Sequence, residues 1–135
     1  MTNNSVSINN NIQGLRQSFT RDEYVSPAVF AHEMNEIFAK RWNLVGRADQ
    51  LVHVGDRLVV EIGNESILIV RNREGELRAY YNVCQHRGSQ LCDKSGSGFG
   101  AAITCPYHSW SYSLEGKLVS AIHHDKESFD RDSIS

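Results

Sequence analysis

Two short segments of the sequence each contain one cysteine and one histidine. Cys84-Gln85-His86 has the spacing C-x-H, and Cys105-Pro106-Tyr107-His108 has the spacing C-x-x-H. Thiolate sulfur and imidazole nitrogen are ligands that bind transition metals well. Gly88 and Pro106 suit the tight bends that each loop needs to turn two side chains inward. The two segments therefore predict a metal centre with two sulfur and two nitrogen ligands.

This ligand set matches a Rieske [2Fe–2S] centre, in which two cysteines hold one iron and two histidines hold the other. Cys84 and Cys105 are the predicted ligands of the first iron, and His86 and His108 those of the second. Neutral imidazoles in place of two thiolates make the cluster less negative, so it accepts an electron more readily. The sequence therefore predicts a carrier of single electrons.

The same four residues leave a second metal open. They could hold a structural zinc ion tetrahedrally, in an interaction module, although zinc sites usually pair cysteine with cysteine and histidine with histidine at short spacing. A third cysteine, Cys92, has no partner at ligand spacing and is predicted to be a buried thiol outside the centre. Three cysteines without an export signal disfavour a disulfide scaffold.

Composition narrows the possible functions. The chain has 135 residues, with 14 Lys and Arg against 16 Asp and Glu and a formal net charge of -2. This length fits one domain, and the near-neutral charge offers no basic surface to nucleic acid or anionic lipid. The sequence has no apolar run of membrane-spanning length, and its polar start lacks the regions of a secretory signal. We expect a cytoplasmic protein that binds neither nucleic acid nor membrane.

The N-terminal part divides into an arm and a helical segment. Residues 1–18 are rich in Asn, Ser and Gln, which predicts a flexible arm. Residues 19–43 form the predicted leader helix segment, since Ser26-Pro27 is typical of a helix start and the helix is expected to reach about residue 42. Apolar residues at spacings of three and four form one stripe that is expected to pack on the core: Phe30, Met34, Ile37, Phe38 and Trp42.

Residues 44–122 change to short β-like runs separated by glycine-containing turns. Such runs predict an antiparallel β-sandwich, with the two Cys/His loops at one end. The polar residues 123–135 are predicted to be a tail that leads out of the domain. The predicted strands are residues 43–45, 57–62, 66–72, 77–83, 101–104, 111–114 and 118–122.

The residues around the four predicted ligands resemble a known family. Residues 82–88 (Asn-Val-Cys-Gln-His-Arg-Gly) and 105–112 (Cys-Pro-Tyr-His-Ser-Trp-Ser-Tyr) are similar to the two cluster loops of the Rieske domain that begins ring-hydroxylating oxygenase α subunits. The resemblance extends from about residue 20 to about residue 130, although Ser109 stands where glycine is commoner. It implies a mainly β, Rieske-type antiparallel sandwich with one N-terminal helix. It also implies that Arg87 lies beside the cluster. Trp110 is expected to cover the cluster against water, the alternative being an ordinary aromatic residue of the core.

The resemblance implies a function as one part of an oxidoreductase. In such enzymes a ferredoxin or a flavin/iron–sulfur reductase reduces the cluster. The cluster passes electrons to a mononuclear Fe(II) in a following domain, often within a homotrimer, where an aromatic substrate is hydroxylated. We expect that iron domain to be absent from this chain, so the chain alone should not hydroxylate. His123-His124-Asp125 are no substitute, because three consecutive side chains point to different faces. A stand-alone Rieske ferredoxin is the alternative, which the leader helix disfavours.

Overall fold

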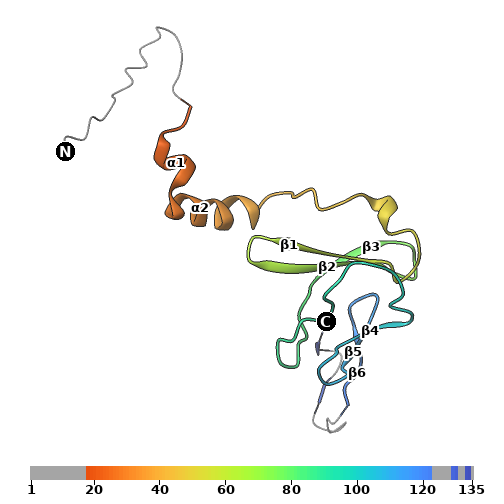
Figure 1. Cartoon of the computed structure of the whole chain (residues 1–135). Coiled ribbons are helices and arrows are strands. Elements are labelled where there is room, and N and C mark those ends of the chain that lie inside the picture. Colours follow the sequence, from red (N-terminus) through yellow and green to blue (C-terminus); the bar gives the residue numbers. More distant parts are fainter. Residues whose placement is uncertain (1–17, 123–128, 131–132, 135) are drawn as a thin grey trace, which may run out of the picture.

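The computed structural model describes residues 18–122, 129–130 and 133–134. The leader helix segment projects from a body built of two small antiparallel sheets (Figure 1). Most of the predicted arm 1–18 and of the predicted tail 123–135, including His123-His124-Asp125, lies outside the described residues. Among the described residues, no helix has the length and apolar character needed to cross a membrane. The mainly β prediction is confirmed.

The leader helix segment contains three short helices. Helix α1 (Arg21–Val25) begins at a capping box between Thr20 and Glu23. Helix α2 (Pro27–Glu33) follows with Ser26 as N-cap and proline in its first turn, as predicted. It continues into the π-helical turn η1 (Met34–Phe38), so the helix ends before residue 42.

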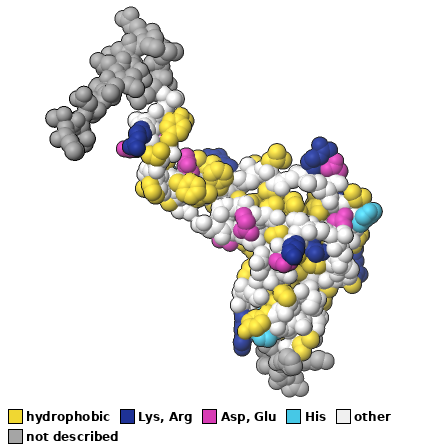
Figure 2. All heavy atoms as spheres, in the orientation of Figure 1, with side chains coloured by type: hydrophobic (Ala, Val, Ile, Leu, Met, Phe, Trp, Pro, Cys, Tyr) yellow, Lys and Arg dark blue, Asp and Glu magenta, His cyan; other side chains and the backbone are white. Residues whose placement is uncertain are grey.

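The prediction that the apolar stripe packs into the core is wrong for the described part of the chain. Phe30 is 57% exposed, Ile37 is 49% exposed and Trp42 is fully exposed. Figure 2 shows yellow apolar side chains at the surface of the projecting leader helix segment. The helical period holds as far as Phe38, and Trp42 lies beyond the end of the helix. A helical period also carries no information about which surface covers an apolar helix face.

The first sheet contains β1 (Arg57–Ile62), β2 (Glu65–Arg71) and β3 (Leu77–Tyr81), in the order β1-β2-β3. Leu68 on the central strand lies opposite Val59 and Tyr80, and it is completely buried together with Val70. Alternate residues of β2 therefore form the core face of this sheet, as the period of two predicts.

The second sheet contains β4 (Ala102–Thr104), β5 (Ser111–Ser113) and β6 (Leu118–Ser120), in the order β4-β5-β6. It contributes Ile103, Tyr112 and Leu118 to the same buried cluster, and Leu114, just after β5, belongs to that cluster too. The six strands agree with the predicted runs to within two residues at each end. The predicted strand at 43–45 is absent. Those residues follow the helices of the leader segment and pair with no described strand.

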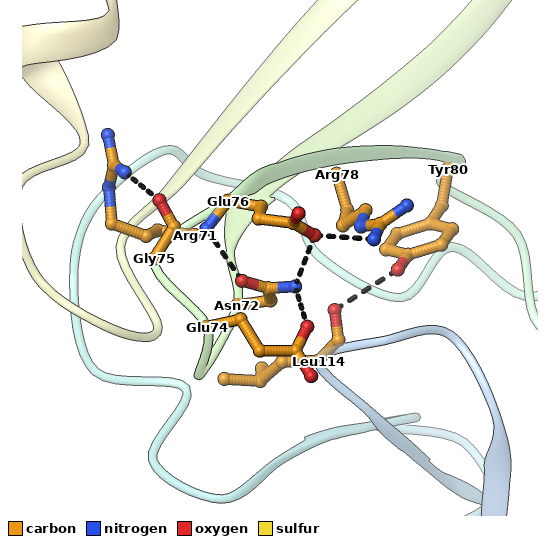
Figure 3. A network of polar contacts seen from close by, with 8 residues as sticks. All are labelled: Arg71, Asn72, Glu74, Gly75, Glu76, Arg78, Tyr80 and Leu114. Carbon is orange, nitrogen blue, oxygen red and sulfur yellow. Dashed lines mark hydrogen bonds and ion pairs between the residues drawn. The ribbon is translucent and has the colours of Figure 1, made fainter.

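A buried asparagine organises the turn between β2 and β3, and a tyrosine joins the two sheets (Figure 3). The Oδ1 of Asn72 accepts the backbone N–H of Glu76 at 2.7 Å, and its Nδ2 donates to Glu74 at 3.0 Å. The hydroxyl of Tyr80 on β3 donates to the carbonyl of Leu114 after β5 at 3.1 Å. A Cβ on Gly116 would lie 2.6 Å from the Tyr80 ring.

We expect Gly116→Ala to lower the free energy of unfolding by about 1 to 3 kcal/mol more than Gly63→Ala, because a methyl group at Gly116 would push against Tyr80. Both glycines have a positive φ, but a Cβ on Gly63 would meet nothing within 4 Å. Urea denaturation of the two variants and the parent measures the difference. Equal losses would show that the Tyr80 contact tolerates a side chain here.

Candidate metal centre

The first Cys/His loop leaves β3 and closes on itself through two backbone hydrogen bonds. The N–H of Gly88 donates to the carbonyl of Cys84 at 2.9 Å, and the N–H of Cys84 donates to the carbonyl of Ser89 at 2.7 Å. Gly88 has φ of 69°, a conformation that glycine adopts without steric cost. The loop therefore places Cys84 at its base and His86 near its tip.

The second loop, between β4 and β5, repeats this geometry. The N–H of Ser109 donates to the carbonyl of Cys105 at 3.1 Å, and the N–H of Cys105 donates to the carbonyl of Trp110 at 2.8 Å. Ser109 in the second loop corresponds to Gly88 in the first loop. Its φ is 60°, and among the described residues no other residue except glycine has a positive φ. The departure from glycine noted in the sequence therefore falls on a position that favours glycine.

The two loops bring all four predicted ligands together. Cys84 and Cys105 are each 2% exposed and interact through their side chains. His86 and His108 are half-buried, and their ring centroids lie 4.8 Å apart at an interplanar angle of 68°. The thiols thus form a buried pair and the imidazoles form a second pair nearer the surface.

The surroundings of Cys105 favour its thiolate. Burial acts to raise the pKa of this thiol, but the backbone N–H groups of Tyr107 and His108 and the side chains of Cys84 and Ser89 act against it, and the pKa is lowered overall. Hydrogen bonds to the charged form of a group stabilise that form. A cysteine must be deprotonated to bind a metal, so the loop prepares this side chain as a ligand.

Tyr112 on β5, the last residue of the second segment that resembles the family, is a further residue of the site. Its hydroxyl lies 3.3 Å from the sulfur of Cys84 and accepts the backbone N–H of Gln85 at 3.0 Å. Burial, and then the hydrogen bond with Cys84, raise the pKa of Tyr112 far above its ordinary value. The phenol therefore keeps its proton and can donate it to a thiolate at Cys84. Its position on β5, directly after the second Cys/His loop, was the sequence feature that could have identified Tyr112 as a residue of the site.

The two residues predicted to lie beside the centre differ in their contacts. Trp110 is 2% exposed, and its indole stacks on His86 with ring centroids 4.7 Å apart and an interplanar angle of 7°. Arg87 is exposed and makes no hydrogen bond or ion pair to another described residue. The structure thus gives Trp110 a contact with a predicted ligand, and the role of Arg87 stays a prediction.

Cys92 takes part in a separate set of contacts. Its sulfur accepts the Nε–H of Arg57 at 3.1 Å, and its thiol donates to the carbonyl of Lys94 at 3.1 Å. It is 8% exposed. Like the other two cysteines, it forms no disulfide. Cys92 is therefore the buried thiol that was expected.

We expect Ser109→Gly to raise the free energy of unfolding by about 0.5 to 1 kcal/mol, because a Cβ is strained at this positive φ. Ser97→Gly is the matched control, since Ser97 is an exposed loop serine without a positive φ. That variant should lose a few tenths of a kcal/mol through the added freedom of the unfolded chain. Thermal unfolding of the two variants gives the sign, and a loss at both positions would contradict the expectation.

A comparison with protein families matches residues 41–129 to the Rieske [2Fe-2S] domain. The glycine betaine monooxygenase oxygenase subunit of Chromohalobacter salexigens is 44% identical over 107 residues, which are 79% of this chain and 24% of that protein. The carnitine monooxygenase oxygenase subunit of Acinetobacter baumannii is 41% identical over 119 residues, which are 87% of this chain and 32% of that protein.

Solved structures give the same result. A quaternary ammonium Rieske monooxygenase in complex with L-carnitine is 41% identical, with a TM-score of 0.77 over 84% of this chain and 32% of that chain. Naphthalene 1,2-dioxygenase from Rhodococcus sp., bound to indole, is 29% identical, with a TM-score of 0.72 over 80% of this chain and 25% of that chain. The chain thus spans between about a quarter and a third of the length of these relatives.

These relatives correct one expectation. The proteins that are 41% and 44% identical are named for carnitine and glycine betaine, so the expectation of an aromatic substrate, and with it a role in aromatic hydrocarbon catabolism, is not supported. The relatives are oxidoreductases, and this chain corresponds to the Rieske part of their oxygenase subunits. With the family match across residues 41–129 and the two cluster loops within it, the chain belongs to the Rieske [2Fe–2S] domain family.

Proposed function

We propose that Cys84 and Cys105 hold one iron, and His86 and His108 the other iron, of a [2Fe–2S] cluster through which this domain transfers single electrons. The observation that carries the proposal is the meeting of a buried thiol pair and a half-buried imidazole pair on two loops of equal backbone geometry. The bound cluster supplies a one-electron redox centre.

The chain's own groups stabilise negative charge on the sulfur side of this site. The backbone N–H groups of Tyr107 and His108 interact with the sulfur of Cys105. The Tyr112 hydroxyl lies 3.3 Å from the sulfur of Cys84. Hydrogen bonds to the cysteine sulfurs are among the factors that set cluster potentials. These donors favour the reduced form, which carries the additional electron.

The imidazole side of the site is the one that a redox partner can approach. His86 and His108 are half-buried, and Tyr107 is 60% exposed with its ring centroid 3.7 Å from that of His108. We propose that a ferredoxin or a flavin/iron–sulfur reductase delivers electrons here, and that a mononuclear iron domain accepts them.

The substrate of the whole protein is a proposal drawn from similarity. Relatives named for glycine betaine and carnitine are 44% and 41% identical, whereas the naphthalene dioxygenase is 29% identical. We therefore propose a quaternary ammonium compound as the substrate of a full-length, multimeric oxygenase. The helices α1 and α2 disfavour the alternative of a stand-alone Rieske ferredoxin.

The structural zinc module is the other candidate for the same residues. Tetrahedral zinc needs its ligands gathered around one point, whereas a [2Fe–2S] cluster needs two pairs around two irons. Within the described ranges, no three His, Cys, Asp or Glu side chains gather as a site for one metal ion. The separate thiol and imidazole pairs fit the two-iron arrangement.

A set of cysteine variants tests the ligand assignment. We expect Cys84→Ser and Cys105→Ser each to abolish the cluster, because a serine hydroxyl keeps its proton near neutral pH and is a much weaker ligand of iron than a thiolate. Cys92→Ser is the matched control, since its buried thiol contacts Arg57 and Lys94 instead of the two loops. Iron and acid-labile sulfide should be about two of each per chain in the parent and the control.

Each outcome of this test has a definite meaning. Absorption and EPR spectra before and after dithionite should show a reducible cluster in the parent and in Cys92→Ser. A colourless parent protein that holds one zinc per chain would overturn the proposed electron-transfer function and support the structural zinc module. A cluster retained in Cys84→Ser and lost in Cys92→Ser would overturn the ligand assignment.

We expect Tyr112→Phe to lower the reduction potential by about 20 to 60 mV. One hydrogen bond contributes about 0.5 to 1.5 kcal/mol, and a one-electron couple shifts by about 59 mV per factor of ten. Tyr80→Phe is the control, because the Tyr80 hydroxyl donates to the carbonyl of Leu114 and not to a predicted ligand. A redox titration followed by EPR measures both, and an equal shift in the two variants would exclude a specific effect of Tyr112.

A further inference from the structure

Trp110 lies between a predicted iron ligand and a phenylalanine from the C-terminal segment. On one side its indole stacks on His86, with ring centroids 4.7 Å apart. On the other side it meets Phe129 edge to face, with ring centroids 5.4 Å apart and an interplanar angle of 64°. The three rings form a continuous row of contacts from Phe129 through Trp110 to His86.

Phe129 comes from a segment that returns to the core. Phe129 and Ile134 pack against the buried cluster that contains Trp110 and Leu118. The backbone N–H of Leu118 also donates to the carbonyl of Ile134 at 3.4 Å. The packing of Phe129 and the contacts of Ile134 therefore keep Phe129 next to the indole.

We propose that Phe129 is a positioning residue for His86, acting through Trp110. This inference rests on the proposed function, in which His86 binds iron. The Phe129 ring fixes the indole against the imidazole and keeps water from that side of the site. Groups that contact a metal ligand fix its orientation, and the apolar shell around a metal site controls solvent access and redox potential.

This row of ring contacts acts on one histidine of the pair. His108 has Tyr107 as its aromatic neighbour, at 3.7 Å between ring centroids, and Tyr107 is 60% exposed. His86 has Trp110, which is 2% exposed and covered by Phe129. Loss of the Phe129 ring should therefore open the His86 side to water and leave the surroundings of His108 unchanged.

Opening that side should raise the reduction potential. Reduction adds a negative charge to the cluster, and water stabilises added charge better than an apolar ring does. For Phe129→Ala we expect the equilibrium constant for reduction to increase about twofold to tenfold, which is about 20 to 60 mV at about 59 mV per factor of ten. Phe129→Tyr keeps the ring and should restore the potential of the parent.

Phe99 provides the matched control for simple loosening of the core. It is half-buried and packs against the same buried cluster, but its ring faces the guanidinium of Arg57 at 4.5 Å. Phe99→Ala should lower the unfolding temperature, as Phe129→Ala does, and leave the potential unchanged. Equal shifts of potential in Phe99→Ala and Phe129→Ala would overturn the positioning role.

Tryptophan fluorescence tests the same contact in the chain without its cluster. The protein has two tryptophans, and Trp42 is fully exposed, so Trp42→Phe leaves Trp110 as the emitting residue. In that background, Phe129→Ala should shift the emission to longer wavelength and increase its quenching by acrylamide, and Phe99→Ala should not. Unchanged emission in Phe129→Ala would overturn the inference.

The two measurements separate the two proposals. If the parent chain binds no [2Fe–2S] cluster, the proposed function fails and with it the assignment of His86 as an iron ligand. The fluorescence change would then still establish that Phe129 holds Trp110. If the cluster is present and its potential responds to Phe129→Ala alone, both proposals are supported.

Discussion

The backbone hydrogen bonds that close the two loops determine where the four predicted ligands lie. In each loop a cysteine carbonyl accepts the N–H four residues later, from Gly88 in one loop and Ser109 in the other. Because the backbone geometry is the same, both cysteines turn into the core and both histidines turn toward the surface. A site whose ligand positions are set by backbone hydrogen bonds is organised before a metal binds.

Buried polar groups connect these loops to the sheets. Asn82, at the start of the first loop, is 3% exposed, and its side chain pairs with both backbone groups of Cys92 at 2.6 and 2.9 Å. Tyr80 joins β3 to the residue that follows β5. Since buried polar groups are costly unless they are paired, the bonds of Asn82 fix the chain around the first loop, and the Tyr80 bond holds β3 against the chain that follows β5. The β-sheets thus serve the site mainly as a frame.

The sequence predicted what local patterns encode. The six strands follow from short apolar runs between turns, and the Cys/His spacing led to the four residues that the structure brings together. The fate of the apolar stripe at Phe30 and Ile37 depends on a covering surface, which periodicity cannot supply. The place of Tyr112 just after the second loop indicated a residue near the site, but its contact with Cys84 joins residues distant in the sequence. The contact of Phe129 with Trp110 likewise joins residues distant in the sequence, and no local pattern predicted it.

The two predicted histidine ligands have different neighbours, and this difference follows from the loops themselves. In the second loop, Tyr107 precedes His108 at the exposed tip, while Trp110 follows at the base and enters the core. The indole then meets His86 of the first loop, so one loop supplies the aromatic partner of both histidines. A buried partner excludes water and an exposed partner admits it. The iron that both histidines are proposed to hold would therefore have one dry side and one side open to a redox partner.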